Sequence, residues 1–397
     1  MRNKHNQIKN WTGKVILHVD INSFYSSCEE IRNTSLKGKQ HAVIMTNQTF
    51  GNITKGVVAT CSYEAKRLGV QSGMPLYKAL ELCPNLILLT VDKSYYNKMS
   101  ELIMKIIEGF SDSFEQASID EAFLDCTAKI SSSNLTIEEY AKQIKKTIQE
   151  SCGGLLTSIG VSTSKSVAKI ASDYQKPDGL IIVSKEKINK FLYPLEVERI
   201  SGIGVKTQKI LKGEMKIKTI GQLAETDVQI LIEKFGRKTG TWMWQVSNGE
   251  DNEPVIPRDD HISLSNESTL NNFTQDREEI KKCLHELVDE LFERVINNDY
   301  QFRTVAIKLV RTDFRIETRE TSYTNYQKNR KSIESVIDDL LDKFIFGNEL
   351  SDTDKIIDSN KKILTVRKVG LKVSNLIRDK NRRNTRSRQK TLLEYID

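Results

Sequence analysis

The stretch ASIDEAFLD, residues 117–125, constrains the fold more than any other part of the chain. Ile119 and Phe123 suit a buried strand, yet Asp120 and Glu121 lie next to each other between them. Neighbouring side chains of a strand point to opposite faces, so a regular strand would force one carboxylate into the core at a high free-energy cost. Two solutions remain: the pair forms a hairpin turn in water, or both acids converge on a cation.

Length and composition are those of a multidomain globular protein. The 397 residues predict two to four compact units, and 38% hydrophobic with 28% charged residues is an ordinary globular balance. We expect no membrane span, because no run of about 18 apolar residues occurs, and the polar start MRNKHNQIKNWTGK lacks the apolar core of a secretory signal. The six scattered cysteines form no CxxC pair, and the five histidines are also dispersed, which argues against structural zinc. Free thiols predict a reducing, cytoplasmic setting.

The positive charge is concentrated near the end of the sequence. The formal net charge is +7, and residues 378–390 hold seven Lys or Arg and one Asp. This segment therefore accounts for nearly all of the excess. It is either a solvated, disordered arm or an arm attracted to an anionic polymer.

Hydrophobic patterns in the first half predict a sheet covered by helices. Residues 15–20 form a strand pattern that ends in the carboxylate of Asp20. We interpret His18 as a core histidine with a backbone partner, with a ligand role as the alternative. Apolar residues at three- and four-residue spacing predict a helix over 95–110, and another is expected over 136–151, followed by a strand in LLTSIGV. Because strands and helices form separate runs, we expect an α+β sheet with helices on one face.

The pattern changes at about residue 184. Two short helical patterns are joined by Gly202-Ile203-Gly204, and a helical unit continues to about residue 249. The run GEDNEPVIPRDDHISLSNES has two prolines and little periodicity, so we interpret it as a linker. A helix over 276–297 and strands in FRTVAIKLVRTDF and KKILTVRKVGLKVSNL then predict a second α+β unit with a basic outer sheet face.

The acids of the first half could meet at one edge of the first sheet. Asp20 lies 100 residues before Asp120, and both are expected at strand ends or turns. Three carboxylates brought together with Glu121 would repel strongly unless divalent cations neutralised them. Oxygen ligands favour Mg²⁺ or Mn²⁺, and two such ions can activate a hydroxyl and stabilise a leaving phosphate oxygen. Taken alone, the acids fit a surface hairpin turn better than a metal site.

Five motifs that occur in order reverse that balance. They are HVDINSFYSSCEE, ATCSYEAKRLGVQSGMP, ASIDEAFLD, SIGVSTSKSVAKIASDYQKPDG and ISGIGVKTQKIL. As a set, they resemble the Y-family DNA polymerases, specifically the DinB or polymerase IV branch that copies damaged templates, over residues 14–375. The resemblance implies an α+β multidomain fold, the right-hand polymerase. The implied domains are the palm (1–32 and 93–183), small fingers (33–92), a helical thumb with a helix-hairpin-helix (184–248), a linker (249–261), an α+β little finger (262–377) and a basic tail with a clamp-binding motif (378–397).

The resemblance also implies an active site. Asp20, Asp120 and Glu121 take the places of the catalytic carboxylates, and the backbone carbonyl of Ile21 is an added ligand. Together they would bind two Mg²⁺ ions, for which Mn²⁺ can substitute. Tyr25 takes the place of the steric gate, an aromatic ring that collides with a ribose 2′-hydroxyl and so favours dNTPs.

Further contacts with the dNTP follow from the same resemblance. One position departs from the family pattern, since Lys66 stands where arginine is usual, and Arg67 follows it. Lysine offers a point charge and no bidentate fork, so either the contact is weaker or Arg67 supplies it. The implied nucleotide-binding residues are Phe24, Tyr25, Thr60, Tyr63, Lys66 and Lys176.

Two regions are expected to contact primer–template DNA. The glycines of SGIGV, residues 201–205, would let backbone amides approach phosphates at a helix N-terminus. Basic residues of the last domain would contact the phosphate backbone. The implied DNA-binding residues are Gly202, Gly204, Lys206, Arg303, Lys308, Arg311, Arg367, Lys368 and Lys372.

The segment QKTLLEYI resembles a sliding-clamp binding motif. Gln389, Leu392 and Tyr395 are in place, and Ile396 stands where a second aromatic residue is usual. The motif favours a ring of the PCNA type, with the bacterial β ring as the alternative, and a frayed amphipathic end is the simpler interpretation. A clamp tether would raise the effective concentration of the enzyme at DNA.

Three functions compete at this point. The first is a monomeric translesion DNA polymerase of low fidelity that binds primer–template DNA, dNTPs and Mg²⁺. A catalytically inactive DNA-binding relative is the second, and the intact set of three acids argues against it. The third is another two-metal nucleotidyl-transfer enzyme on a palm-like fold, such as a cyclase or nuclease. The thumb and little-finger motifs argue against that one.

Overall fold

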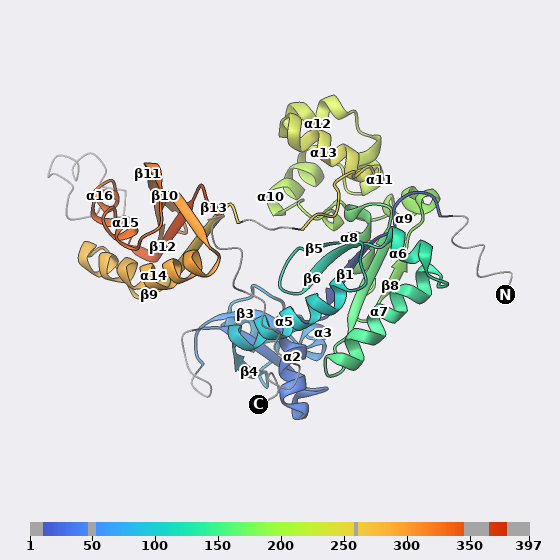
Figure 1. Cartoon of the computed structure of the whole chain (residues 1–397), viewed down its shortest axis with the longest axis horizontal. Coiled ribbons are helices and arrows are strands. Elements are labelled where there is room, and N and C mark those ends of the chain that lie inside the picture. The colour runs from blue at the N-terminus through green and yellow to red at the C-terminus, as the bar shows by residue number, and fades with distance from the viewer. Residues whose placement is uncertain (1–10, 47–52, 258–260, 345–364, 379–397) are drawn as a thin grey trace. The chain divides into compact units, whose positions relative to one another are not determined.

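The protein contains two compact units, one within residues 1–258 and the other within residues 259–397 (Figure 1). The computed structural model describes residues 11–46, 53–257, 261–344 and 365–378. None of the helices in these described segments has the length and apolar character that a membrane crossing needs. The expectation of more than one unit is confirmed.

A five-stranded sheet lies at the centre of the first unit. Its strands are ordered β5–β6–β1–β7–β8, and neighbours are antiparallel except for β7 and β8, which are parallel. Residues 117–125 form the turn after β5 and the strand β6, so the expected hairpin is confirmed. The strands are β1 (Ile16–Ile21), β5 (Ser113–Gln116), β6 (Glu121–Asp125), β7 (Thr157–Ser162) and β8 (Leu180–Ile182).

One face of this sheet packs against two long helices, α5 (Lys93–Glu108) and α7 (Ile137–Ser151). Leu17 and Val19 of β1 are buried in the resulting core. A capping box, in which Thr136 and a glutamate three residues later bond each other's backbone, fixes the start of α7. Both helices were predicted from their apolar periodicity.

The other face is covered by α8 (Lys165–Tyr174), so the expectation of helices on one face only was wrong. The second face of β1 and β6 is apolar as well, and Ile16 and Phe123 pack there against Ala168 of α8. Gly160 of β7 permits the close approach. A Cβ atom at this position would lie 2.0 Å from the carbonyl oxygen of Ala168, so the backbone of α8 rests directly on the strand.

A smaller sheet and several short helices complete the N-terminal part of this unit. The sheet has the order β3–β2–β4, and its core includes Val58, Ala65 and Leu76. The stretch GVVATCSYEAKRLGV, residues 56–70, forms the strand β3 followed by the short helix α3. The elements are α2 (Phe24–Arg32), a 3₁₀ turn (Thr34–Leu36), β2 (His41–Met45), β3 (Val57–Cys61), α3 (Tyr63–Arg67), α4 (Leu76–Leu82), β4 (Ile87–Thr90) and α6 (Thr127–Ser132).

A helical segment follows the first sheet, as expected, but its glycine turn is not flanked by two α-helices. Only a 3₁₀ turn, Val197–Arg199, precedes Gly202, whose φ of 104° lies in the region that favours glycine. The ring of Trp242 closes over this glycine, 2.9 Å from where a Cβ would be. The segment contains a 3₁₀ turn (Lys185–Lys187), α9 (Ile188–Leu192), α10 (Val205–Gln208), a π-helical stretch (Lys209–Glu214), α11 (Ile220–Glu225), α12 (Val228–Phe235) and α13 (Arg237–Ser247).

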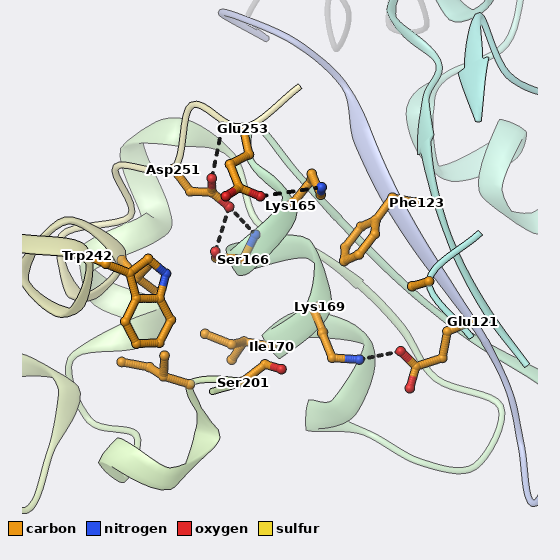
Figure 2. Close-up of a pocket in the computed structure, with 13 residues that line it drawn as sticks. Glu121, Phe123, Lys165, Ser166, Lys169, Ile170, Ser201, Trp242, Asp251 and Glu253 are labelled. Carbon is orange, nitrogen blue, oxygen red and sulfur yellow. Dashed lines mark hydrogen bonds and ion pairs between the residues drawn. The ribbon is translucent and has the colours of Figure 1, made fainter. Parts of the chain in front are cut away.

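The first part of the expected linker is anchored to α8. Asp251 accepts hydrogen bonds from the backbone N–H and the hydroxyl of Ser166, at 2.9 and 2.6 Å, and so caps the first turn of the helix (Figure 2). Glu253 lies 3.6 Å from Lys165, and Val255 is buried beside Phe123. Sequence periodicity cannot reveal such docking, because it depends on single side chains that reach a distant helix.

The second unit is an α+β domain with a five-stranded sheet, in which β11–β10–β12–β9 follow in order and β13 pairs with β10. The predicted helix and two strands are confirmed. Three strands were not predicted: β9 begins at Ser263, inside the run interpreted as linker, β11 has no buried residue to create a pattern, and β13 is only two residues long. The elements are β9 (Ser263–Thr274), α14 (Arg277–Asn297), β10 (Tyr300–Arg311), β11 (Ile316–Gln327), α15 (Lys331–Glu334), α16 (Ile337–Leu341), β12 (Val366–Ser374) and β13 (Ile377–Arg378).

Candidate active site

Three acids meet where the strand β1 ends and its neighbour β6 begins. Asp20, near the end of β1, lies directly opposite Glu121, the first residue of β6. Asp120 occupies the β5–β6 turn, and its carbonyl accepts a hydrogen bond of 3.0 Å from the N–H of Ile21. The hairpin thus resolves the problem of two adjacent acids: one sits in the turn and the other begins the strand beside Asp20, so neither enters the apolar core.

The carboxylates of Asp20 and Asp120 are poorly solvated. Only 6% of Asp20 is exposed, and burial raises its pKa to about 6, although Lys176 Nζ lies 2.8 Å from its Oδ2 and opposes the shift. Burial also raises the pKa of Asp120, which accepts a hydrogen bond of 2.6 Å from the Ser118 hydroxyl. These two groups would gain electrostatic stabilisation from an additional cation.

Glu121 accepts hydrogen bonds from two side chains, one on the neighbouring strand β1 and one on α8. His18 Nε2 lies 3.3 Å and Lys169 Nζ 2.5 Å from the same carboxylate oxygen, Oε2. The hydrogen bond from His18, together with Lys169, lowers the pKa of Glu121 to about 2. His18 is fully buried, as expected, but it bonds Glu121 and the Ser172 hydroxyl instead of the backbone. Because His18 lies two residues before Asp20 in β1, on the same face of the strand, its position in the sequence could have indicated this contact with the acids.

The three acids suit a hard divalent cation by their chemistry. Carboxylate and carbonyl oxygens are the ligands that Mg²⁺ and Mn²⁺ prefer. Within the described residues, however, no three His, Cys, Asp or Glu side chains are already arranged around one metal position. The carboxylates of Asp20 and Glu121 are each paired with a lysine and are not directed at a shared metal position. The donor set and the backbone register fit the ions, and the side chains must reorient to bind them.

The aromatic residues of α2 differ in their surroundings. Tyr25 is half-buried and stacks on the ring of Tyr96, with centroids 4.2 Å apart and planes 13° from parallel. Tyr96 is fully buried, and its hydroxyl donates a hydrogen bond of 2.7 Å to Glu29. Phe24 is only 2% exposed within the core, so its side chain does not face a nucleotide, in contrast to the expectation.

The expected phosphate-binding cations approach the acids from two sides. Lys66 of α3 donates a hydrogen bond of 2.6 Å to the Ser23 hydroxyl and lies 4.5 Å from the centre of the Tyr63 ring. Burial lowers the pKa of Lys66, and proximity to Lys176 acts in the same direction. Thr60 lies on β3, just before this helix.

Arg67 does not take the place of Lys66 beside the acids. The side chain of Arg67 is 74% exposed and lies 3.7 Å from Glu64 on its own helix. Lys66, in contrast, interacts electrostatically with Asp20 and Lys176. Of the two residues, Lys66 is the one at the site.

The expected DNA contacts of the helical segment are accessible. Gly202, Gly204 and Lys206 are exposed, and Gly204 directly precedes α10. Both glycines fit the expectation of backbone that a phosphate could approach.

The basic face of the second unit is partly neutralised. Glu267 of β9 pairs with Lys308, at 2.6 Å, and with Lys368, an acid that the sequence pattern did not single out. Arg303 and Arg367 lie over aromatic rings, 5.7 Å from that of Tyr326 and 4.6 Å from that of Phe314, and Lys372 is half-buried on the same sheet.

Arg311 is a correction to the expected set of DNA contacts. It is only 6% exposed, and its Nε donates to Glu317 at 2.7 Å. A register irregularity between Val310 and Arg311 accompanies this change of environment at the end of β10. The clamp-motif residues Gln389, Leu392, Tyr395 and Ile396 lie outside the described residues.

Comparisons with known proteins agree with these observations. The chain matches the model of the impB/mucB/samB family over residues 19–173 and that of its C-terminal domain over residues 261–392. A protein named DNA polymerase IV from Nitrosopumilus maritimus is 35% identical over 377 residues, which is 94% of this chain and 99% of the relative. A DNA polymerase IV from Methanosarcina acetivorans is 36% identical over 338 residues, 84% of this chain and 91% of the relative.

Solved structures show the same likeness. A chimera of the Y-family DNA polymerases Dbh and Dpo4 matches with a TM-score of 0.79 and 27% identity, covering 92% of this chain and all of that one. The structure of DinB from Sulfolobus solfataricus matches with a TM-score of 0.59 and 27% identity over the same shares of the two chains.

Proposed function

The chain belongs to the impB/mucB/samB family of Y-family DNA polymerases, and we propose that it extends DNA primers with two Mg²⁺ ions held by Asp20, Asp120 and Glu121. The protein is a translesion DNA polymerase: it adds dNMPs to a primer 3′ end under the direction of a template, including damaged templates. The register that sets Asp20 opposite Glu121, with Asp120 in the adjoining turn, carries the proposal for the ions.

Each residue at the site has a separate task in this mechanism. When bound, the two ions would lower the pKa of the primer 3′-hydroxyl and offset the charge of the leaving pyrophosphate. Asp20, Asp120 and Glu121 would hold the ions, with the Ile21 carbonyl as a further ligand. Lys66, with Lys176, supplies positive charge for the triphosphate, beside the hydroxyl groups of Thr60 and Tyr63. Their side chains are exposed or half-buried, which supports contact with a ligand.

The ring of Tyr25 selects the sugar in this proposal. Its stacking on the buried Tyr96 restricts the movement by which the ring could avoid a 2′-hydroxyl. An immobile ring excludes a larger sugar more strictly than a mobile one, because overpacking of a rigid site is costly.

The finer domain division remains part of the proposal. We assign residues 1–32 and 93–183 to the palm, 33–92 to the fingers, 184–248 to the thumb and 262–377 to the little finger. Four hydrophobic clusters that lie mainly within these segments support the division, although Val43 joins the palm cluster and Val167, Ile170, Ala171 and Val183 join that of the thumb. Gly202, Gly204 and Lys206 in the thumb, and Arg303, Lys308, Arg367, Lys368 and Lys372 in the little finger, are the proposed DNA contacts.

Primer extension on intact and abasic templates tests the activity. We expect the protein to extend a primer on the intact template with Mg²⁺ and all four dNTPs, and to insert a nucleotide opposite the abasic site. An intact-template product without any insertion opposite the lesion would contradict the translesion assignment, and no product on either template would contradict polymerase activity.

We also propose that residues 389–396 bind a sliding clamp of the PCNA type. Deleting residues 389–397 should leave extension without clamp unchanged but remove the stimulation by a clamp loaded on the primer–template, lowering product formation at dilute enzyme by about 10²-fold. Alanine at both Leu392 and Tyr395 should reproduce the deletion, while alanine at Arg386 and Arg388 of the basic segment should not. Equal stimulation of the deleted and full-length proteins would refute the tether.

A further inference from the structure

Three lysines on or just beyond α8 face three acids of the sheet. Lys165 and Lys169 lie four residues apart on one side of the helix, and Lys176 follows its C-terminal end, where the chain has become extended. Lys165 pairs with Glu115 of β5 at 2.7 Å, Lys169 with Glu121 of β6 at 2.5 Å, and Lys176 with Asp20 of β1 at 2.8 Å. The acids come from three adjacent strands.

The first pair differs from the other two. Lys165 and Glu115 are almost fully buried, with 9% and 2% of their side chains exposed, so they form a permanent ion pair of the interior. Lys169 and Lys176 retain 21% and 29% exposure, and their partners are two of the three proposed metal ligands. Their ammonium groups therefore neutralise carboxylates that the proposed metal ions would also use, each through one oxygen, Oε2 of Glu121 and Oδ2 of Asp20.

Lys169 has no role in the mechanism described above, whereas Lys176 is assigned to the triphosphate and also pairs with Asp173 at 2.6 Å. Lys169 has space to move, since it lines a cavity of about 360 Å³ together with Glu121, Ser201 and Trp242 (Figure 2). Glu121 would keep a second partner after the lysine departs, because His18 bonds the same oxygen.

We propose that Lys169 is a positioning residue that serves as the exchangeable counter-ion of Glu121. Without metal, its ammonium group neutralises the carboxylate and keeps the three acids from repelling one another. When a divalent cation binds, the ammonium group leaves Glu121 and moves into the adjoining cavity. This inference rests on the proposed metal site. It implies that Lys169 competes with the metal for Glu121. Removing the lysine should therefore raise the affinity for the metal and lower the stability of the metal-free protein.

The test uses the full chain without DNA or nucleotide, so that metal binding is measured apart from catalysis. Mn²⁺ serves as the probe in a titration followed by thermal unfolding and by the electron paramagnetic resonance signal of free Mn²⁺. Lys169→Met should lower the Tm in EDTA relative to the wild type and lower the Kd for Mn²⁺ by about tenfold, the equivalent of one lost charged hydrogen bond. Lys169→Gln should behave in the same way, which guards against a folding defect of one variant.

Two control variants separate exchange from simple structural support. Lys165→Met breaks the neighbouring buried pair, so it should lower the Tm equally with and without Mn²⁺ and leave the Kd unchanged. Lys169→Arg keeps the positive charge and should restore values near those of the wild type.

Two outcomes would overturn the proposal. One is a Kd for Mn²⁺ in Lys169→Met that equals or exceeds that of the wild type. The other is that neither the wild type nor Lys169→Met binds Mn²⁺ or changes its Tm when Mn²⁺ is added, because removal of the competing lysine should have permitted binding. Neither outcome decides the proposed function, which depends on primer extension and on the Asp120→Ala variant.

Discussion

Asp120→Ala should abolish primer extension, lowering kcat by about 10³-fold or more, because it removes one of three carboxylates that hold the proposed ions. Asp120 lies in the β5–β6 turn, where its side chain bonds the Ser118 hydroxyl and supports no packed element. Its loss leaves the strands and the hydrophobic core intact. We therefore expect the affinity for primer–template DNA to stay within about twofold of the wild type, since phosphate contacts elsewhere dominate that affinity.

Single-turnover primer extension and a filter-binding titration at fixed salt measure these two quantities. Glu138→Ala is the matched control, since it removes an exposed carboxylate of α7 that pairs with Lys142 on the same helix. It should extend primers at the wild-type rate. Wild-type extension by Asp120→Ala would refute the metal assignment, and a parallel loss of DNA binding would show that the turn supports the fold and not the chemistry.

Tyr25→Ala should admit ribonucleotides. Removal of the ring opens the space that a 2′-hydroxyl needs, and overpacking a rigid site costs about 1–3 kcal/mol, so the kcat/KM ratio of dNTP to rNTP should fall by about 10- to 100-fold. Tyr25→Phe keeps the ring and its stacking on Tyr96, and it should preserve the discrimination.

The measurement compares kcat/KM for one matched dNTP and rNTP opposite the same template base. Incorporation of dNTP by Tyr25→Ala provides an internal control, because the three acids and Lys66 are unchanged in this variant. An unchanged dNTP-to-rNTP ratio would exclude Tyr25 as the gate. A ratio that falls equally in Tyr25→Phe would instead assign the selection to the hydroxyl.

The elements with a buried face were predicted well. β1, β10 and β12 alternate apolar residues with others, and α5 and α7 repeat them at helical spacing. β11 was missed because none of its residues is buried, so only its hydrogen bonds to β10 define it as a strand. α8 and the second covered face were not predicted, since the close packing of this helix depends on the absence of a side chain at Gly160.

The sequence by itself determined which acids this protein brings to its site, because the motifs that contain Asp20, Asp120 and Glu121 lie on strand ends and a turn that local patterns define. Only the tertiary structure decided what those acids contact. Glu121 meets His18 and Lys169, which lie 103 and 48 residues away, and Arg311 turns to Glu317 instead of toward solvent. Which side chains become partners depends on how the strands and helices pack, and neither residue spacing nor local propensity contains that information.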